Sequence, residues 1–240
     1  NIDQLSILMA NITSLVVKDS QVDSTLLCFN KVIQTLVMPE RTLDHVAPFA
    51  ASLTHLNCRL RTDSVSLDCI EELTNLRCLE LSSWETCGQL NAQWGVFPHL
   101  ASLALLRINC TPASLQCLPG SLRKIVLKRC ETNCNVMSAL GNLTGLKVLE
   151  LTRCGHLTNR GLSHLKALPL EFVKLRHLAR IDIRGLSHLT TCPIQTIDIT
   201  GCKELQYMAV EDIWTLFGRM RTVWGLNLRT RWVRVIKDFE

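Results

Sequence analysis

The sequence of 240 residues is poor in aromatic side chains, which make up only 5% of it, although 47% of its residues are hydrophobic. A core formed by this chain must therefore consist mainly of Leu, Ile and Val. No uninterrupted apolar run approaches about 18 residues, the length that indicates a transmembrane helix, and no basic-then-apolar signal peptide follows Asn1. We therefore expect neither a membrane span nor a membrane partner. The chain also lacks an initiator Met, so we expect a fragment of a longer protein.

Sequence motifs that carry catalytic, metal or phosphate chemistry are also absent. There is no Gly-rich phosphate loop, no H-E-x-x-H or G-x-S-x-G motif, and no C-x-x-C pair among the 12 cysteines. Cys154 stands two residues from His156, but we expect this thiol to be buried, and a reactive thiol needs an exposed, electropositive setting. We predict no enzymatic activity in this chain, no metal site and no cofactor; a catalytic domain elsewhere in a parent protein stays open.

One apolar pattern recurs about ten times along the chain. It has the form apolar-x-x-apolar-x-apolar, as in the segment LKVLEL. Its first position falls at Ile12, Ile33, Leu53, Leu76, Leu100, Leu122, Leu146, Leu170, Ile194 and Val223. The last interval, of 29 residues, is the longest. A period in the twenties with this apolar spacing is the signature of a leucine-rich repeat.

Each repeat is expected to contribute one strand and one crossover segment. In LKVLEL the three leucines would point inward and the other side chains toward the open side, because side chains alternate along a strand. Parallel neighbours need a crossover, and Leu157, Leu162, Leu165 and Leu168 follow the strand in a pattern typical of a helix. We predict an α/β solenoid, a leucine-rich-repeat horseshoe with a parallel concave sheet and short helices or irregular segments on the convex side. It would form a single domain over residues 1–240.

Three cysteines, Cys130, Cys154 and Cys202, share one repeat position, eight residues after the first apolar residue. A free thiol behaves as a small hydrophobe with a weak donor, so we expect a buried ladder of thiols in the turns after the strands. Reduced core thiols favour an intracellular protein, cytoplasmic or nuclear. Three N-x-[ST] tripeptides, which matter only in a secreted chain, stand against that interpretation. They begin at Asn11, Asn109 and Asn142.

The seventh repeat continues as CGHLTNRGLSHL, which resembles the cysteine-containing leucine-rich repeat with its pattern C-x-x-L-T-D-x-G-L-x-x-L. The matching residues are Cys154, Leu157, Thr158, Gly161, Leu162 and Leu165, and Asn159 stands where Asp is usual. Such repeats are best known from the F-box and leucine-rich-repeat proteins, the substrate receptors of cullin-type ubiquitin ligases. The resemblance covers about the last half of the chain and implies the repeat class. An F-box would have to lie upstream of Asn1.

The concave face is the expected binding surface of such a solenoid. Basic and aromatic residues at its outward strand positions are Lys124, Lys128, Phe172, Lys174 and Arg176. At the strand exits of four consecutive repeats stand Arg107, Arg129, Arg153 and His177, here called the basic column. Because parallel strands lie ~4.8 Å apart, the column would be roughly 15 Å long. We predict that these nine residues bind a protein with an acidic or phosphorylated surface. The alternative is a solvated edge, with Glu150 and Glu171 weakening its field.

A second basic segment, residues 214–240, ends the chain. Six Arg and Lys residues alternate there with apolar residues and with Trp214, Trp224 and Trp232. Arginine beside tryptophan can stack nucleic-acid bases, but a net charge of +5 and a pI of about 8.6 are low for a dedicated nucleic-acid domain. We favour a C-terminal cap over the last leucines, which a solenoid end requires.

The sequence therefore predicts a protein–protein interaction module, such as a substrate receptor, adaptor or scaffold, that binds its partner on the concave strand face. The alternative is a structural subunit of a large, RNA-containing assembly, docked through the basic Trp/Arg-rich segment 214–240. Nucleic acid is the less favoured partner.

Overall fold

The computed structural model describes residues 12–16, 33–38, 46, 49–60, 70–90, 93–205, 208, 210–218, 221–228 and 231–236. Within these ranges the backbone alone is described at residues 38, 84–90, 210, 226–228 and 231–236.

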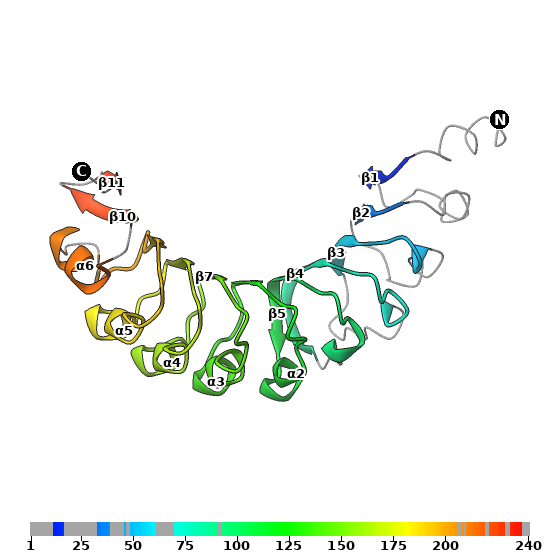
Figure 1. The fold of residues 1–240 in the computed structure, drawn as a ribbon, viewed down its shortest axis with the longest axis horizontal. Coiled ribbons are helices and arrows are strands. Elements are labelled where there is room, and N and C mark those ends of the chain that lie inside the picture. The colour runs from blue at the N-terminus through cyan, green and yellow to red at the C-terminus, as the bar shows by residue number, and fades with distance from the viewer. Residues whose placement is uncertain are drawn as a thin grey trace.

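The described residues form an arc with strands along its inner, concave side and short helices along its outer, convex side (Figure 1). The strands are β1 Ser14–Val16, β2 Thr35–Met38, β3 His55–Leu60, β4 Cys78–Leu90, β5 Ser102–Cys110, β6 Lys124–Lys128, β7 Val148–Thr152, β8 Phe172–Arg176, β9 Thr196–Asp198, β10 Thr222–Leu228 and β11 Arg231–Ile236. The helical segments are η5 Trp94–Val96, α2 Pro112–Gln116, α3 Cys134–Leu140, α4 Asn159–Ser163, α5 Ile183–Ser187 and α6 Val210–Leu216.

The strands pair in the order of the sequence, and β1 to β10 run parallel. The last strand, β11, folds back antiparallel to β10. The inward residues of successive strands join in one core, in which Leu149, Leu151 and Leu175 are fully buried. The architecture is therefore the predicted α/β solenoid, a horseshoe with a parallel concave sheet. Among the described residues, no helix combines the length and apolar character needed to cross a membrane.

The pairing register follows the predicted repeat up to the ninth strand. The second apolar residue of each repeat stands opposite its equivalents, as Leu149 does between Ile125 and Val173. In the tenth repeat, however, Val223 pairs with Ile197, the second apolar residue of β9, so the predicted start at Val223 is wrong by three places. The cause is Gly225, which has a φ of 92° and interrupts the β10–β11 ladder at a bulge. A glycine at that position removes the apolar residue that the sequence pattern requires.

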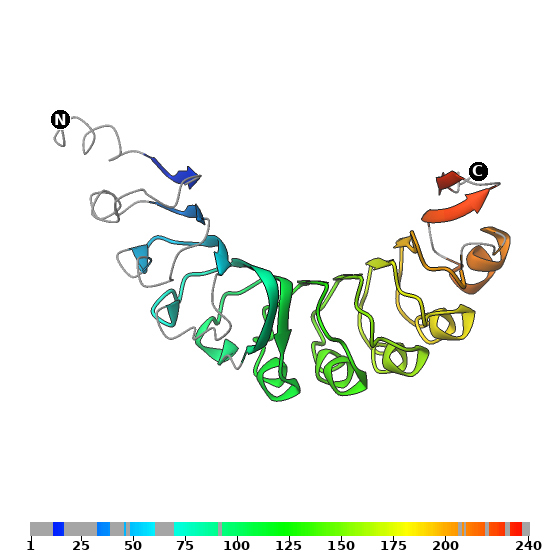
Figure 2. The same ribbon diagram turned by 180° about the vertical axis from the view of Figure 1, so that it is seen from behind.

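The convex side carries an α-helix in five described repeats, whereas the fourth repeat has a long strand followed by the short helix η5. Thr111, Asn133 and Asp182 cap α2, α3 and α5 by accepting hydrogen bonds from backbone N–H groups of the first turn. In the fourth repeat β4 instead continues to Leu90 and pairs with the second half of β5. Figure 2 shows this long pair leaving the concave edge toward the level of α2. The apolar residues of the segment SSWETCGQL, Trp84, Cys87 and Leu90, stand three apart, so sequence spacing alone did not indicate its extended form.

Close packing of neighbouring convex helices makes a glycine position testable. A Cβ on Gly141, which caps the C-terminus of α3, would overlap the backbone carbonyl of His164, whereas a Cβ on Gly155 would meet nothing within 4 Å. Gly141→Ala should lower the free energy of unfolding by about 1–3 kcal/mol, because backbone has to move. Gly155→Ala should be neutral or stabilising by up to about 1 kcal/mol. Urea unfolding of both variants checks this; equal effects would contradict the packing described.

Candidate protein-interaction surface on the concave face

The thiol ladder lies directly behind the concave strands. Cys130, Cys154 and Cys202 are buried free thiols, as predicted, and each donates a hydrogen bond to a strand carbonyl of an earlier repeat. The shortest of these bonds, from Cys202 Sγ to the carbonyl oxygen of Leu175, measures 2.8 Å. Burial raises the pKa of Cys130 to about 12 and of Cys202 to about 11, and it also raises the pKa of Cys154. Its burial and raised pKa disfavour the thiolate form of Cys154 that a nucleophile needs.

The basic column shares a backbone conformation that the sequence did not indicate. Arg107, Arg129, Arg153 and His177 have φ values of 60°, 55°, 55° and 53°. This left-handed region favours glycine, and an L-residue in it costs roughly 1–2 kcal/mol. The equivalent residue of the next repeat is Gly201, with a φ of 77°. A left-handed residue therefore recurs at the same position of five successive repeats and carries a basic side chain in four of them. The predicted strand exit is wrong for Arg107, which lies within β5 because that strand continues to Cys110, whereas the other four residues follow the ends of their strands.

These turns are held by backbone hydrogen bonds between repeats. The N–H groups of Arg129 and Arg153 donate to the carbonyl oxygens of Thr152 and Arg176, at 2.8 and 2.9 Å. The side chains of Arg129 and Arg153 are exposed, that of Arg107 is half-buried, and the imidazole of His177 lies over Gly201. Backbone contacts thus set the positions of the column, while its side chains extend outward.

Other predicted binding residues are engaged in ion pairs. Glu150 on β7 is only 9% exposed and lies between Lys124 on β6 and Lys174 on β8, with N–O distances of 3.4 and 3.3 Å. The ammonium group of Lys174 also lies over the ring of Phe172, 5.0 Å from its centroid. Glu150 therefore offsets one of the two lysine charges, and these four residues form one packed group on the concave face.

Arg176 is also engaged internally. Its Nε donates to the carboxylate of Asp198 at 2.7 Å, and the same carboxylate accepts from the hydroxyl of Thr200 at 2.7 Å. Asp198 is 2% exposed. Its burial alone would raise its pKa, but the hydrogen bonds from Arg176 and Thr200 outweigh this, so the pKa lies below the ordinary value. Arg176 is therefore oriented by Asp198 and keeps one face toward solvent.

Three predicted residues remain without such engagement. In the described part of the chain, no ion pair involves Lys128, Arg129 or Arg153, and all three side chains are exposed. They come from the ends of β6 and β7 and therefore stand side by side. Of the nine residues predicted from the sequence, this trio and the exposed His177 are available to an acidic partner, and the trio supplies the Lys and Arg side chains.

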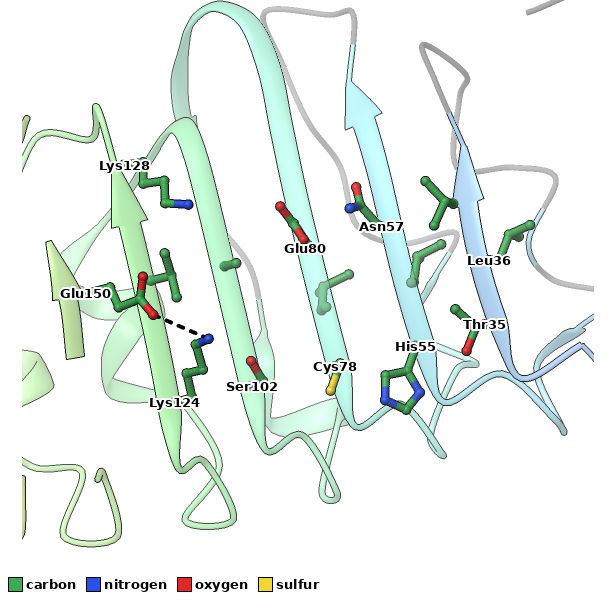
Figure 3. Close-up of a pocket in the computed structure, with 15 residues that line it drawn as sticks. Thr35, Leu36, His55, Asn57, Cys78, Glu80, Ser102, Lys124, Lys128 and Glu150 are labelled. Carbon is green, nitrogen blue, oxygen red and sulfur yellow. Dashed lines mark ion pairs between the residues drawn. The ribbon is translucent and has the colours of Figure 1, made fainter. Parts of the chain in front are cut away.

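A hollow of about 260 Å³ lies beside this trio, over β2 to β7 (Figure 3). Its floor is low because Cys78, Ser102 and Ala104 are small, while longer side chains such as His55 and Lys124 stand at its sides. The exposed carboxylate of Glu80 projects into the hollow from β4, and Lys128 borders it from β6. Sequence alternation places these residues on the concave face, but nothing in the sequence distinguishes them as a site.

The structure describes only part of the C-terminal segment 214–240, and only two of the three N-x-[ST] sites. Trp214 packs partly against the core, and Trp224 is 38% exposed on β10. Arg229 lies outside the described residues, as does Asn11. Asn109 is buried and accepts a hydrogen bond from the N–H of Glu131, so its amide is occupied, whereas Asn142 is exposed. The described residues contain no cluster of His, Cys, Asp and Glu that could hold a metal ion.

No protein-family model and no curated protein matches the sequence. Solved structures do match the fold. A chain of the mouse RP105/MD-1 complex is similar over 91% of this chain, with 21% identity and a TM-score of 0.61. A chain of the TLR13–ssRNA13 complex is similar over 93%, with 16% identity and a TM-score of 0.62. A chain of the yeast Rad7 and Elc1 complex is similar over 97%, with 15% identity and a TM-score of 0.61.

These similarities extend over different shares of the solved chains, and this chain spans 39%, 33% and 68% of them respectively. At such low identity the likeness concerns the fold. The sequential parallel sheet, the convex helices and these structural neighbours agree with one another. The chain has the leucine-rich-repeat fold.

Proposed function

We propose that this chain is a non-catalytic protein–protein interaction module that binds an acidic or phosphorylated segment of its partner on the concave face. The observation that carries this proposal is the exposed trio Lys128, Arg129 and Arg153, whose charges no described acidic residue neutralises. Elsewhere on the same face Glu150 forms ion pairs with Lys124 and Lys174, and Asp198 forms one with Arg176. Guanidinium groups bind carboxylates and phosphates in bidentate geometry, which suits this class of partner.

The backbone conformation supports the proposal independently. Glycine would relieve the positive φ at Arg129 and Arg153, yet these positions hold charged side chains. Residues kept in costly backbone conformations cluster at functional sites. The cost of the left-handed turn is therefore offset, in this proposal, by the contact of each arginine with the partner.

We further propose that the module is intracellular and of the cysteine-containing type, and that it serves as a substrate receptor or adaptor. Buried thiols at the ladder position support the type, and the similar fold of Rad7, solved with Elc1, gives an example within a protein complex. Residues 214–240 would act as the C-terminal cap, since β11 covers the edge of β10. The alternative, an RNA-containing assembly, is supported by the exposed ring of Trp224.

Site-directed photo-crosslinking tests the proposed function. A photoreactive amino acid at Thr152, on the concave face between the arginines, should crosslink to a protein partner in cell extract. The same group at Ser138, exposed on the convex helix α3, is the matched control and should not do so. Crosslinks from Ser138 alone would show that the wrong face was chosen. Crosslinks to RNA from Thr152 would favour the alternative function.

A further inference from the structure

The hollow beside Arg129 and Arg153 carries charges of both signs that are not satisfied within it. Glu80 and Lys128 are exposed, border the same cavity, and make no ion pair with any described residue. Figure 3 shows both side chains at the same end of the hollow. Only β5 lies between their strands, and its lining residue nearest to them is the small Ala104. An occupant that satisfies both groups must present a cation to Glu80 and an anion to Lys128.

The pairing register gives the separation of the two groups. Glu80 pairs with Ala104 and Ala104 with Val126, so Lys128 lies two strands away and two residues further along. With strands ~4.8 Å apart and a rise of about 3.3 Å per residue, the two Cα atoms are about 12 Å apart. An extended polypeptide covers that distance in about four residues. The cavity is smaller than the pockets of about 300–1,000 Å³ that enclose small ligands, so it has room for a few side chains of a chain that passes over it.

We propose that the hollow binds an extended segment of the partner protein that carries a basic and an acidic residue about three or four positions apart, the basic one at Glu80 and the acidic one at Lys128. This inference rests on the proposed function and adds the polarity of the partner segment to it. Arg129 follows Lys128 in the chain. A partner segment that continues past its acidic residue at Lys128 therefore reaches the basic column, where an acidic or phosphorylated stretch can bind. Charge of both signs also selects against a uniform polyanion, because Glu80 repels it.

An array of immobilised synthetic peptides tests the inference directly. Each peptide has a neutral background with two charged residues four positions apart, either Lys with Glu in both orders, Lys twice or Glu twice. The wild-type chain should prefer a mixed peptide over both same-charge peptides by about fivefold to tenfold, since two exposed ion pairs are formed together. Glu80→Lys should shift the preference to the Glu–Glu peptide, and Lys128→Glu should shift it to the Lys–Lys peptide. The double variant should prefer a mixed peptide in the reversed order.

Both positions are exposed, so thermal unfolding of each variant should match the wild type and exclude misfolding. The inference is overturned if the wild type does not favour a mixed peptide, if Glu80→Lys leaves the preference unchanged, or if no peptide binds. It is also overturned if a single-stranded oligoribonucleotide displaces the preferred peptide and binds more tightly. A different result would separate the two proposals: the wild type binds the Glu–Glu peptide, Arg129→Glu abolishes this binding, and Glu80→Lys has no effect on it. This result would overturn the inference and leave the proposed function intact.

Discussion

Changing Arg107, Arg129 and Arg153 together to Glu should reduce partner binding by about a hundredfold or more, because each inverted charge repels an acidic partner and slows encounter. At the exposed Arg129 and Arg153 the free energy of unfolding should change by about 0.5 kcal/mol or less each. Arg107 is half-buried and should cost more, so the double change of Arg129 and Arg153 alone is the measure of binding at unchanged stability. The three turns keep their positive φ, and Glu occupies the left-handed region no less readily than Arg. The affinity of the variant for the partner protein identified by crosslinking should also depend less steeply on salt concentration, because fewer ion pairs remain to be screened. Binding titrations at several salt concentrations measure this.

Two controls separate charge from position. Changing Arg229, Arg231 and Arg234 to Glu reverses the same number of charges in the C-terminal segment and should leave concave binding largely unchanged. Arg129→Gly with Arg153→Gly removes the charges and relieves the left-handed turns, so binding should fall while the chain unfolds at the same or a higher urea concentration. Loss of binding in the C-terminal set alone would refute the concave site and favour docking through residues 214–240.

The fold could be predicted because the repeat period carries most of the structural information. Each repeat buries its apolar residues against equivalent residues of its neighbours, so one recurring pattern specifies strand, register and inward face together. Leu149 pairs with Ile125 and Val173 as that pattern requires. The prediction was wrong where the local backbone departs from the repeat. Gly225 interrupts β10 with a bulge, and a pattern search then finds its apolar spacing three residues too late.

The geometry of the candidate site was less accessible to sequence reasoning. The alignment of the basic column was predictable from the period, but its left-handed backbone was not, because arginine gives no sign of a positive φ. The one available signal was Gly201, which occupies the same repeat position after His177. The ion pairs of Glu150 with Lys124 and Lys174 depend on side-chain orientation across three strands. For this reason the sequence overstated the charge available on the concave face.

The hollow could not be predicted because it results from size differences between distant residues. Cys78 and Ser102 are 24 positions apart in the sequence and become neighbours through the pairing of β4 with β5. Small side chains on two adjacent strands produce a depression only when the strands beyond them carry longer ones, as β6 does with Lys124 and Lys128. A repeating pattern predicts which residues face outward. Where the surface is raised or hollowed, however, depends on how side-chain size differs between repeats.

Replacing Leu149 with Ala should destabilise the chain by about 2–5 kcal/mol, because it leaves a cavity in a close-packed core. Leu149 is fully buried in β7, where it pairs with Ile125 and Val173 of the repeats on both sides. In a solenoid each repeat contacts only its neighbours, so the damage should be greatest locally. Amide hydrogen exchange should therefore accelerate more in β6, β7 and β8 than in β3, and urea unfolding should give the loss of stability.

The adjacent residue provides a control within the same strand. Val148 points toward the concave face and is only half-buried, so Val148→Ala should cost about 1 kcal/mol or less, within the span of strand propensities. The contrast between the two variants measures the alternation of inward and outward side chains on which the concave surface depends. Equal destabilisation by Leu149→Ala and Val148→Ala would mean that Val148 is covered in the folded chain. The concave face at β7 would then be closed to a partner, and the placement of Arg129 and Arg153 beside an open surface would fail with it.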